Sequence, residues 1–222
     1  MANALTNPAV ARVLPFGLYI AFLALNSLIP EGTVDTRWLY PVRVGLVALV
    51  LAFFWRQYDE LRGKFSMPGG FWALGLITGL VVFVLWVNLT APWMLMGGQG
   101  KGFDPRDGDH INVVLAITRI AGAALVVPVM EELFWRSFVM RWIDNPKFRE
   151  ILPTAISLKA LLLSSVVFGL EHNEWFAGIL AGLAYGWLYR VTGNLWVPIV
   201  SHALTNGLLG MWVLYTASWQ FW

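Results

Sequence analysis

VPVMEELFWRSF, residues 127–138, places three charged side chains inside one of the most apolar parts of the chain. On a helix, Glu132 and Arg136 are four positions apart and share one face, so we expect them to pair. Glu131 directly precedes Glu132, so its side chain leaves the helix in a different direction from that of the pair. Pro128 has no backbone N–H, so we expect it to kink the helix and to free a carbonyl in the preceding turn.

The composition is that of an integral membrane protein. Hydrophobic residues make up 58% of the 222 residues and charged residues 13%, whereas soluble domains are about 45–50% apolar and about 25% charged. The mean hydropathy is +0.65. The formal net charge of +2 comes from Lys and Arg spread over short loops, which indicates orientation in a bilayer rather than nucleic-acid binding. The chain has no cysteine, which excludes disulfides, thiolate metal ligands and a cysteine nucleophile.

Seven apolar segments are candidates for transmembrane helices, each of which needs about 20 mostly apolar residues. Because the longer segments can be divided differently, we expect an all-α, polytopic transmembrane bundle of seven or eight helices. No repeat or long polar linker interrupts it, so residues 1–222 are expected to form a single domain. The segments are roughly 13–29, 40–55, 70–91, 111–130 (continuing to about 142), 155–171, 175–190 and 195–218.

The distribution of basic residues predicts the orientation of the chain. With a cytoplasmic N-terminus, eight Lys and Arg residues fall on inner loops and four on outer loops, which is the bias of the positive-inside rule. We therefore expect a multi-pass protein with its N-terminus in the cytoplasm. The inner residues are Arg12, Arg56, Arg62, Lys64, Arg141, Lys147, Arg149 and Arg190, and the outer residues are Arg37, Arg43, Lys101 and Arg106.

Two further polar clusters interrupt the second half of the chain, which bears the motifs over about 111–218. FGLEHNEW places Phe168 and His172 four residues apart, and SHALTN does the same for His202 and Asn206. Each pair therefore shares one face of a helix.

These features also have structural explanations. Glu132 and Arg136 could simply join two helices, and a single histidine in a helix is most often a hydrogen-bonded structural residue. Glu171 and Glu174 are expected to lie in a solvated turn, outside any site. Arg119, within a predicted span, is expected to be buried and paired.

Energy argues against a purely structural role for the whole set. Each charged side chain at the centre of a bilayer costs about 2.5–3.5 kcal/mol, and one arginine cannot neutralise two carboxylates. A glutamate near two histidines can act as a general base that activates water, and His202 and Asn206 can both donate hydrogen bonds to a developing oxyanion. Two histidines and a glutamate are also a plausible zinc set, although the H-E-x-x-H motif is absent. The residues leave metal-free and zinc-assisted hydrolysis open.

In this order, EExxxR at 131–136, FxxxH at 168–172 and HxxxN at 202–206 resemble the motifs of a known family. It is the CAAX protease and bacteriocin-processing (CPBP, or Abi) family of intramembrane proteases, which includes the type II CAAX prenyl endopeptidases and bacterial Abi-like immunity proteins. The resemblance covers about residues 115–210, whereas the first half is similar only in hydropathy. The whole chain also resembles the CAAX-protease-related proteins that accompany bacterial exosortase systems, and this resemblance implies a bacterial inner membrane.

The resemblance implies a catalytic role for four residues. Glu131 would be the general base that activates water, and His172 would assist it and shuttle the proton. His202 and Asn206 would form the oxyanion hole.

The resemblance also implies a supporting set and a fold. Glu132 and Arg136 would orient Glu131, and Phe168 would belong to the same supporting set. The implied fold has about eight helices around a polar, water-filled intramembrane cavity. No metal is implied, and zinc remains the alternative.

The implied activity is endopeptidase cleavage of a membrane-associated peptide or protein, lipidated or anchored near its C-terminal end. The partners are then this substrate and the lipid bilayer, with no nucleic acid. Two alternatives remain: a non-catalytic immunity or sorting accessory protein, and a proton-coupled transporter, against which no inverted repeat is found. Simple spans would hold Glu131 and His172 at opposite membrane faces, so the tight turn at 172–174 is expected to dip into the membrane unless the predicted boundaries are wrong.

Overall fold

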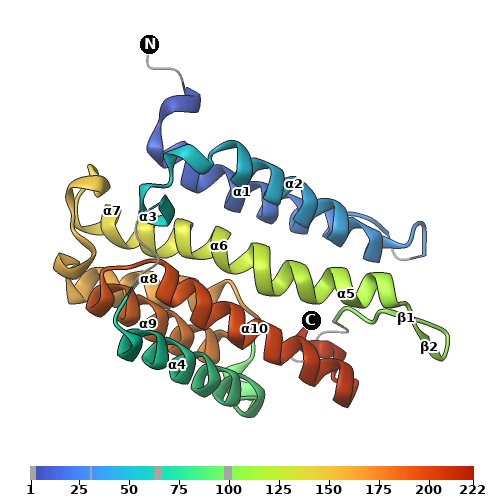
Figure 1. The fold of residues 1–222 in the computed structure, drawn as a ribbon. Coiled ribbons are helices and arrows are strands. Elements are labelled where there is room, and N and C mark those ends of the chain that lie inside the picture. Colours follow the sequence, from blue (N-terminus) through green and yellow to red (C-terminus); the bar gives the residue numbers. More distant parts are fainter. Residues whose placement is uncertain (1–3, 31, 63–66, 98–101) are drawn as a thin grey trace.

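The computed structural model describes residues 4–30, 32–62, 67–97 and 102–222. Within these ranges the chain is an all-α bundle, as the sequence predicts. One continuous helix, Val113–Asp144, runs through the middle of the molecule. Two helices from the start of the chain cover one side of it, and four others cover the opposite side (Figure 1).

Seven long helical segments coincide with the seven predicted segments. Six are single helices, namely α1 (Pro8–Ser27), α2 (Leu39–Phe53), α4 (Gly69–Asn88), α8 (Leu158–Leu170), α9 (Trp175–Thr192) and α10 (Trp196–Thr216). The seventh, Val113–Asp144, contains α5 (Val113–Ala121), a π-helical segment (Gly122–Val126), α6 (Val127–Glu131), a second π-helical segment (Glu132–Val139) and α7 (Met140–Asp144). The short helix α3 (Asp59–Arg62), several 3₁₀ turns, one of which (Thr36–Trp38) leads into α2, and a hairpin of β1 (Arg106–Asp107) with β2 (His110–Ile111) complete the described elements. In the hairpin, Arg106 lies opposite Ile111.

Five helices of the described chain are long and apolar enough to cross a membrane, so the protein is an integral membrane protein. They are Pro8–Ser27, Thr36–Phe53, Gly69–Asn88, Val113–Asp144 and Trp196–Thr216. The predicted segments 155–171 and 175–190 do form helices, but α8 has only 13 residues. At 1.5 Å per residue it is about 20 Å long, shorter than the roughly 30 Å hydrocarbon core.

The helices α8 and α9 form a tight hairpin because glycines line their contact. The Cβ of any other residue at 178 would lie 2.9 Å from the Cα of Gly169, so only glycine permits this approach. Close backbone packing through small residues is typical of helices in membranes. The hairpin holds the turn at 171–174 against the centre of the bundle.

The π-helical segment before Pro128 frees one backbone carbonyl. The N–H of Val127 donates to Gly122 O, five residues back, instead of to Ala123 O. The next residue, Pro128, has no N–H to offer. Ala123 O therefore receives no hydrogen bond from the N–H of residue 127 or from residue 128. This confirms the prediction that the proline frees a carbonyl in the preceding turn.

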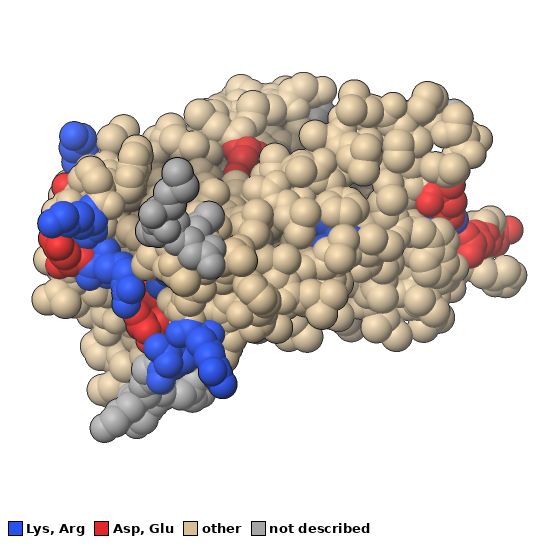
Figure 2. Space-filling model, turned by 90° about the horizontal axis from the view of Figure 1, so that it is seen from above, with Lys and Arg blue, Asp and Glu red and all other residues tan. Residues whose placement is uncertain are grey.

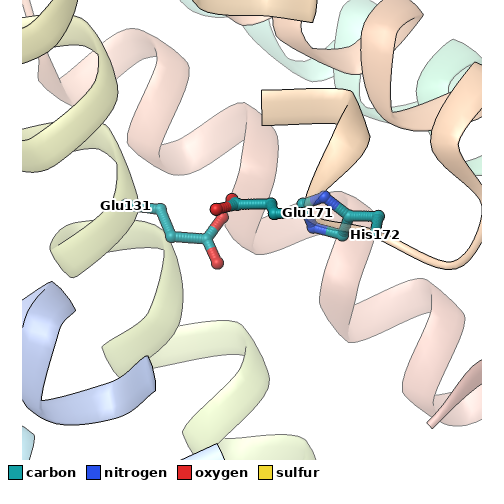
Figure 3. A group of neighbouring side chains, drawn as sticks. All are labelled: Glu131, Glu171 and His172. Carbon is teal, nitrogen blue, oxygen red and sulfur yellow. The ribbon is translucent and has the colours of Figure 1, made fainter. Parts of the chain in front are cut away.

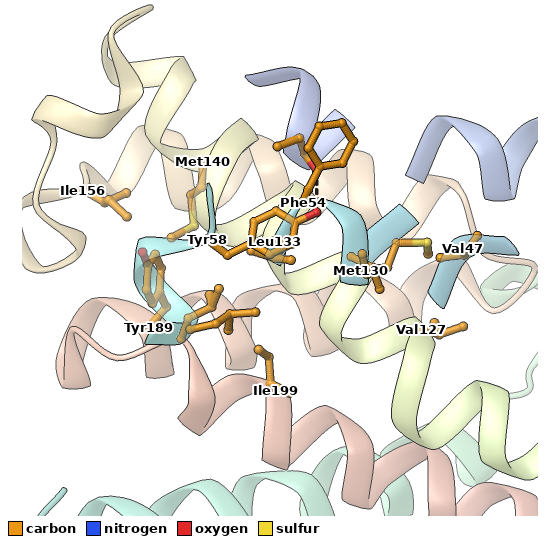
Figure 4. Close-up of a cluster of buried hydrophobic side chains, with 14 of the residues drawn as sticks. Val47, Phe54, Tyr58, Val127, Met130, Leu133, Met140, Ile156, Tyr189 and Ile199 are labelled. Carbon is orange, nitrogen blue, oxygen red and sulfur yellow. Dashed lines mark hydrogen bonds between the residues drawn. The ribbon is translucent and has the colours of Figure 1, made fainter. Parts of the chain in front are cut away.

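An apolar core fills the space between the long helix and its neighbours (Figure 4). Met130 and Leu133 of the long helix are fully buried there, against Val47 of α2 and Tyr189 of α9. The hydroxyl of Tyr58 donates a 2.8 Å hydrogen bond to a carbonyl of α1. This hydroxyl is thus paired within the bundle, as a membrane interior favours.

Charged side chains gather at the two ends of the molecule, and the wide middle of the visible face is almost free of them (Figure 2). This is the pattern of a protein that crosses a bilayer. Lys64 and Lys101, which contribute to the predicted charge bias, lie outside the described residues. The orientation of the chain stays a prediction.

At one end, a buried ionic cluster ties α1, α3 and the long helix together. Arg12 is fully buried, and its Nη2 lies 2.5 Å from Glu60 Oε2. Arg141 Nη1 lies 3.3 Å from Glu60 Oε1, and the Ser137 hydroxyl also donates to this carboxylate. Burial acts to raise the pKa of Glu60, but the charge and hydrogen bonds of Arg12 outweigh it and hold the pKa below its ordinary value.

The substitution Glu60→Gln is expected to destabilise the protein by about 3–5 kcal/mol, because Arg12 and Arg141 would keep buried charges without a partner. Thermal unfolding of the detergent-solubilised protein, followed by tryptophan fluorescence, measures this. Glu150→Gln is the matched control, since Glu150 is an exposed partner of Lys147 and its pair is worth less than about 1 kcal/mol. Equal losses in the two variants would contradict the prediction.

The same cluster sets a pH dependence. Because the folded-state pKa of Glu60 lies below the ordinary value of 4.5, its stabilisation is fully present above that pH. It is lost as the pH falls towards the lower, folded-state pKa. The stability difference between wild type and Glu60→Gln should therefore shrink as the pH is lowered below about 4.5.

Candidate functional site

A cavity of about 240 Å³ lies within the bundle. Its walls come mainly from α1, the long helix, the hairpin of α8 and α9, and α10, with single residues from α2 and α4. The structure therefore confirms the predicted polar cavity and brings together the three sequence motifs around it. The motif residues that line it are Glu131, Phe168, His172, His202 and Asn206, joined by Glu171 and Glu174.

Glu131, Glu171 and His172 point toward one another across this cavity (Figure 3). One ligand atom from each lies within 4.8 Å of the others. The side chain of Glu131 is only 9% exposed, and its Oε2 has no hydrogen-bond partner among the described residues. A buried carboxylate oxygen without a partner is costly unless a ligand, an ion or water occupies the space beside it.

Glu171 was not expected in the site, and the structure corrects this. Its carboxylate faces Glu131, and the indole Nε1 of Trp135 donates a 3.0 Å hydrogen bond to its Oε1. Glu171 lines the cavity but keeps an exposed surface, as expected for a solvated turn, whereas Glu174 is buried, with 8% of its surface exposed. The cause is the shortness of α8, whose end at Leu170 brings the following turn level with the middle of the long helix.

The same geometry removes the predicted separation of Glu131 and His172. Glu131 lies well inside the 32-residue helix rather than near its end, and the turn that carries His172 reaches into the bundle. The short length of the predicted segment 155–171 was the sequence signal for this arrangement. The same signal applies to Glu171, because it precedes His172 in the same turn and is carried into the bundle with it.

His172 is held in one tautomer. Its Nδ1 lies 2.8 Å from the carbonyl oxygen of Phe168. A carbonyl only accepts, so Nδ1 carries the hydrogen and Nε2 keeps its lone pair. The Trp86 ring contacts the imidazole edge to face, with ring centroids 5.4 Å apart. Nε2 can therefore accept a proton or bind a cation.

The predicted pair of Glu132 and Arg136 is present. Arg136 Nε lies 3.1 Å from Glu132 Oε2, and both side chains are almost fully buried. The other carboxylate oxygen, Oε1, accepts from His202 Nδ1 at 2.9 Å. The described contacts of Glu132 thus reach His202 rather than Glu131, the residue that it was expected to orient. Phe168 supports the pair, because the guanidinium of Arg136 lies over its ring at 4.4 Å.

The contact with Glu132 decides what His202 can offer to a ligand. Since Nδ1 donates to a carboxylate, a neutral imidazole presents a lone pair at Nε2, and only the imidazolium presents an N–H there. Nε2 lies 3.9 Å from Glu131 Oε2. The ring of Tyr185 stacks on the imidazole at 4.8 Å and fixes its plane.

Asn206 lines the cavity and uses one amide hydrogen within the bundle. Its Nδ2 donates at 2.9 Å to Ala123 O, the carbonyl that Pro128 and the π-helical segment leave free. The second amide hydrogen remains for a ligand. The irregularity of the long helix therefore anchors Asn206 of α10.

Two chemistries fit this arrangement. A water molecule beside Glu131 and His172 would have a carboxylate and an imidazole lone pair as proton acceptors. Glu131, Glu171 and His172 Nε2 also offer two oxygens and one nitrogen, the ligand types that zinc takes in catalytic sites. The donor set fits a divalent cation.

Comparison with known proteins supports the resemblance seen in the motifs. The family model of type II CAAX prenyl endopeptidase Rce1-like proteins matches residues 113–208. A curated protein of Bacillus subtilis (strain 168) named "Putative membrane peptidase YdiL" is 26% identical over 109 residues, which are 46% of this chain and 41% of that protein. No solved structure matches the chain.

The matched residues contain all three motifs and every motif residue around the cavity. The chain spans less than half the length of the curated relative that it matches. Residues 113–208, which carry most of the long helix, the hairpin and most of α10, are therefore similar to the Rce1-like family of type II CAAX prenyl endopeptidases.

Proposed function

We propose that the protein is an intramembrane endopeptidase that hydrolyses a peptide bond of a membrane-associated substrate. The observation that carries the proposal is the carboxylate oxygen Oε2 of Glu131, which has no hydrogen-bond partner in the described part of the chain and is buried in a cavity beside the lone pair of His172 Nε2. Both groups can accept a proton from the same water. The similarity of residues 113–208 to the Rce1-like family of prenyl endopeptidases supports the same proposal.

In the proposed reaction, Glu131 takes a proton from water, and the water oxygen attacks the carbonyl carbon of the substrate. His172 holds this water through Nε2. The carbon–nitrogen bond then breaks, and the proton returns to the leaving nitrogen to give a free amine. Glu171, which faces Glu131, is placed to pass on this proton.

The attack places a negative charge on the carbonyl oxygen, which needs hydrogen-bond donors. Asn206 would supply its second amide hydrogen. His202 would donate through Nε2 as an imidazolium, whose charge Glu132 balances at Nδ1. Arg136 in turn holds Glu132 in place.

Zinc-assisted hydrolysis is the second candidate, because the donor set of Glu131, Glu171 and His172 fits the ion. When bound there, zinc would supply Lewis acidity and a more acidic water. The accessory-protein and transporter hypotheses use the same cavity without hydrolysis.

The substitution Glu131→Gln is expected to abolish cleavage, a loss of at least about 10²–10⁴-fold, because glutamine cannot accept the proton. Mass spectrometry of protein termini in membranes from cells with wild type or variant measures this. New termini that vanish in Glu131→Gln would also reveal the substrate. Glu150→Gln, exposed and remote, is the control.

Unchanged termini at equal abundance of folded protein would overturn the peptidase proposal. A phenotype that survives Glu131→Gln but not surface substitutions would support the accessory function. Proton-gradient-dependent flux in liposomes would support the transporter.

The substitution Glu171→Gln separates the two hydrolytic mechanisms. Without a metal, it is expected to lower kcat by about 10–100-fold with little change in KM, because only proton transfer to the leaving amine suffers. Zinc analysis of purified wild type is expected to show no stoichiometric metal. One equivalent of zinc that is lost in both Glu171→Gln and Glu131→Gln would replace this mechanism with the zinc-assisted one.

We also propose a bacterial inner-membrane location with a cytoplasmic N-terminus. Because the chain has no cysteine, a cysteine introduced at Glu150 is a unique label. An impermeant maleimide should fail to label Glu150→Cys in intact spheroplasts and should label it after lysis. Labelling before lysis would reverse the orientation.

A further inference from the structure

Helix α4 lies along α10 and approaches it so closely that only glycine fits at the contact (Figure 1). A Cβ at Gly79 would lie 2.5 Å from the carbonyl oxygen of Ser201, the residue before His202. α4 carries none of the three motifs and lies outside the matched residues 113–208. The contact nevertheless brings the backbone of α4 against the part of α10 that bears His202.

Two hydroxyl groups connect α4 to α9 at this level. The hydroxyl of Thr205 in α10 donates at 2.8 Å to the carbonyl oxygen of Gly79, with Ser201 O as a second acceptor at 3.2 Å. It accepts at 2.8 Å from the hydroxyl of Tyr185 in α9. The direction of this chain is fixed, because a carbonyl oxygen can only accept. Both hydroxyl hydrogens are therefore engaged within the bundle, and neither residue has one left for a substrate.

The ring of Tyr185 carries this chain to the proposed oxyanion hole. It lies nearly parallel to the imidazole of His202, with 18° between the two planes and 4.8 Å between the centroids. Tyr185 and Thr205 are both buried, and both line the cavity. A ring held by close packing on its face and by a hydrogen bond at its end has little freedom to move. His202 therefore stacks on a fixed surface.

The stack removes a freedom that the hydrogen bond of His202 leaves. Nδ1 of His202 donates to Glu132 at 2.9 Å. One hydrogen bond holds one atom, so the ring could still turn about this contact and carry Nε2 away from a substrate carbonyl. Tyr185 blocks the turn on one face, and Phe168 meets the imidazole edge to face at 6.4 Å. The direction of Nε2 thus depends on the stack as well as on Glu132.

The same tyrosine ring contacts the group behind the hydrogen bond. The guanidinium of Arg136 lies 5.5 Å from the centroid of Tyr185, and Arg136 pairs with Glu132. Tyr185 therefore borders both His202 and the arginine that holds the acceptor of His202. A displacement of this ring would disturb both supports of the imidazole together.

We propose that Tyr185 and Thr205 are positioning residues that aim Nε2 of His202 at the developing oxyanion, with the carbonyl of Gly79 as their anchor. The inference rests on the proposed peptidase function and gives α4 a part in the site. A displacement of about 1 Å in such a group can cost about 100-fold in rate. Because the oxyanion exists only in the transition state, the loss should appear in kcat rather than in KM.

Kinetics of the full-length protein in phosphatidylcholine nanodiscs test this. The substrate is a synthetic peptide that spans a terminus found in wild-type membranes and absent with Glu131→Gln. Tyr185→Leu is expected to lower kcat by about 10–100-fold with little change in KM, because Nε2 is no longer aimed. Tyr185→Phe keeps the stack and should restore kcat to within about tenfold of wild type. Thr205→Val should match Tyr185→Phe, since each removes the same hydrogen bond.

A double-mutant cycle separates positioning from general support of the fold. Because Tyr185 is proposed to act through His202, Tyr185→Leu should cause little further loss of kcat in a His202→Ala protein. Tyr189→Leu is the matched control, since Tyr189 is fully buried one turn further along α9 in the apolar core. It should lower stability but not the kcat of the folded protein.

Full additivity of Tyr185→Leu with His202→Ala would overturn the inference. An equal loss of kcat in Tyr189→Leu would do the same. Cleavage that persists in Glu131→Gln would instead overturn the peptidase proposal, on which the kinetic test depends.

Nuclear magnetic resonance keeps the inference falsifiable if no cleavage is found. The chain has three histidines, so ring-¹⁵N-histidine gives few signals, and those of His202 are the ones lost in His202→Ala. Wild type and Tyr185→Phe are expected to show one set of His202 signals, with the hydrogen on Nδ1. Tyr185→Leu should give broadened or additional His202 signals. One sharp, unchanged set in Tyr185→Leu would overturn the positioning role, whether or not the protein cleaves peptides.

Discussion

The buried carboxylate of Glu132 holds the centre of the molecule together. It pairs with Arg136 in its own helix and accepts a hydrogen bond from His202 of α10, so it joins the first and third motifs. In a membrane interior a charge of this kind is tolerated only when protein groups surround and pair it. The contact also controls the chemistry, because it decides which proton His202 can offer to a ligand.

The rest of the site depends on two departures from regular helices. The π-helical segment before Pro128 frees the carbonyl of Ala123, and Asn206 takes that carbonyl as an anchor. The short α8 ends inside the bundle and brings Glu171 and His172 to face Glu131 (Figure 3). Irregular backbone at this depth is stable because it lies against protein and a polar cavity rather than lipid.

The arginines of the membrane-spanning helices fall into two groups according to what they contact. Where a carboxylate partner is present, as for Arg12 and Arg136, the arginine joins helices. Arg43 and Arg119 instead stack on aromatic rings and line a cavity that adjoins the one around Glu131.

The sequence by itself determined the membrane class, the approximate helix positions and the three polar motifs, because hydropathy and four-residue spacing are local properties. It also predicted the pair of Glu132 and Arg136, since both lie on one helix face. Only the tertiary structure decided that Glu171 belongs to the cavity, that Glu132 reaches His202, and that Arg119 has no acidic partner among the residues that the structure describes. Each of these depends on how far a neighbouring helix extends and which side chain faces it, and no spacing within a single segment encodes those distances.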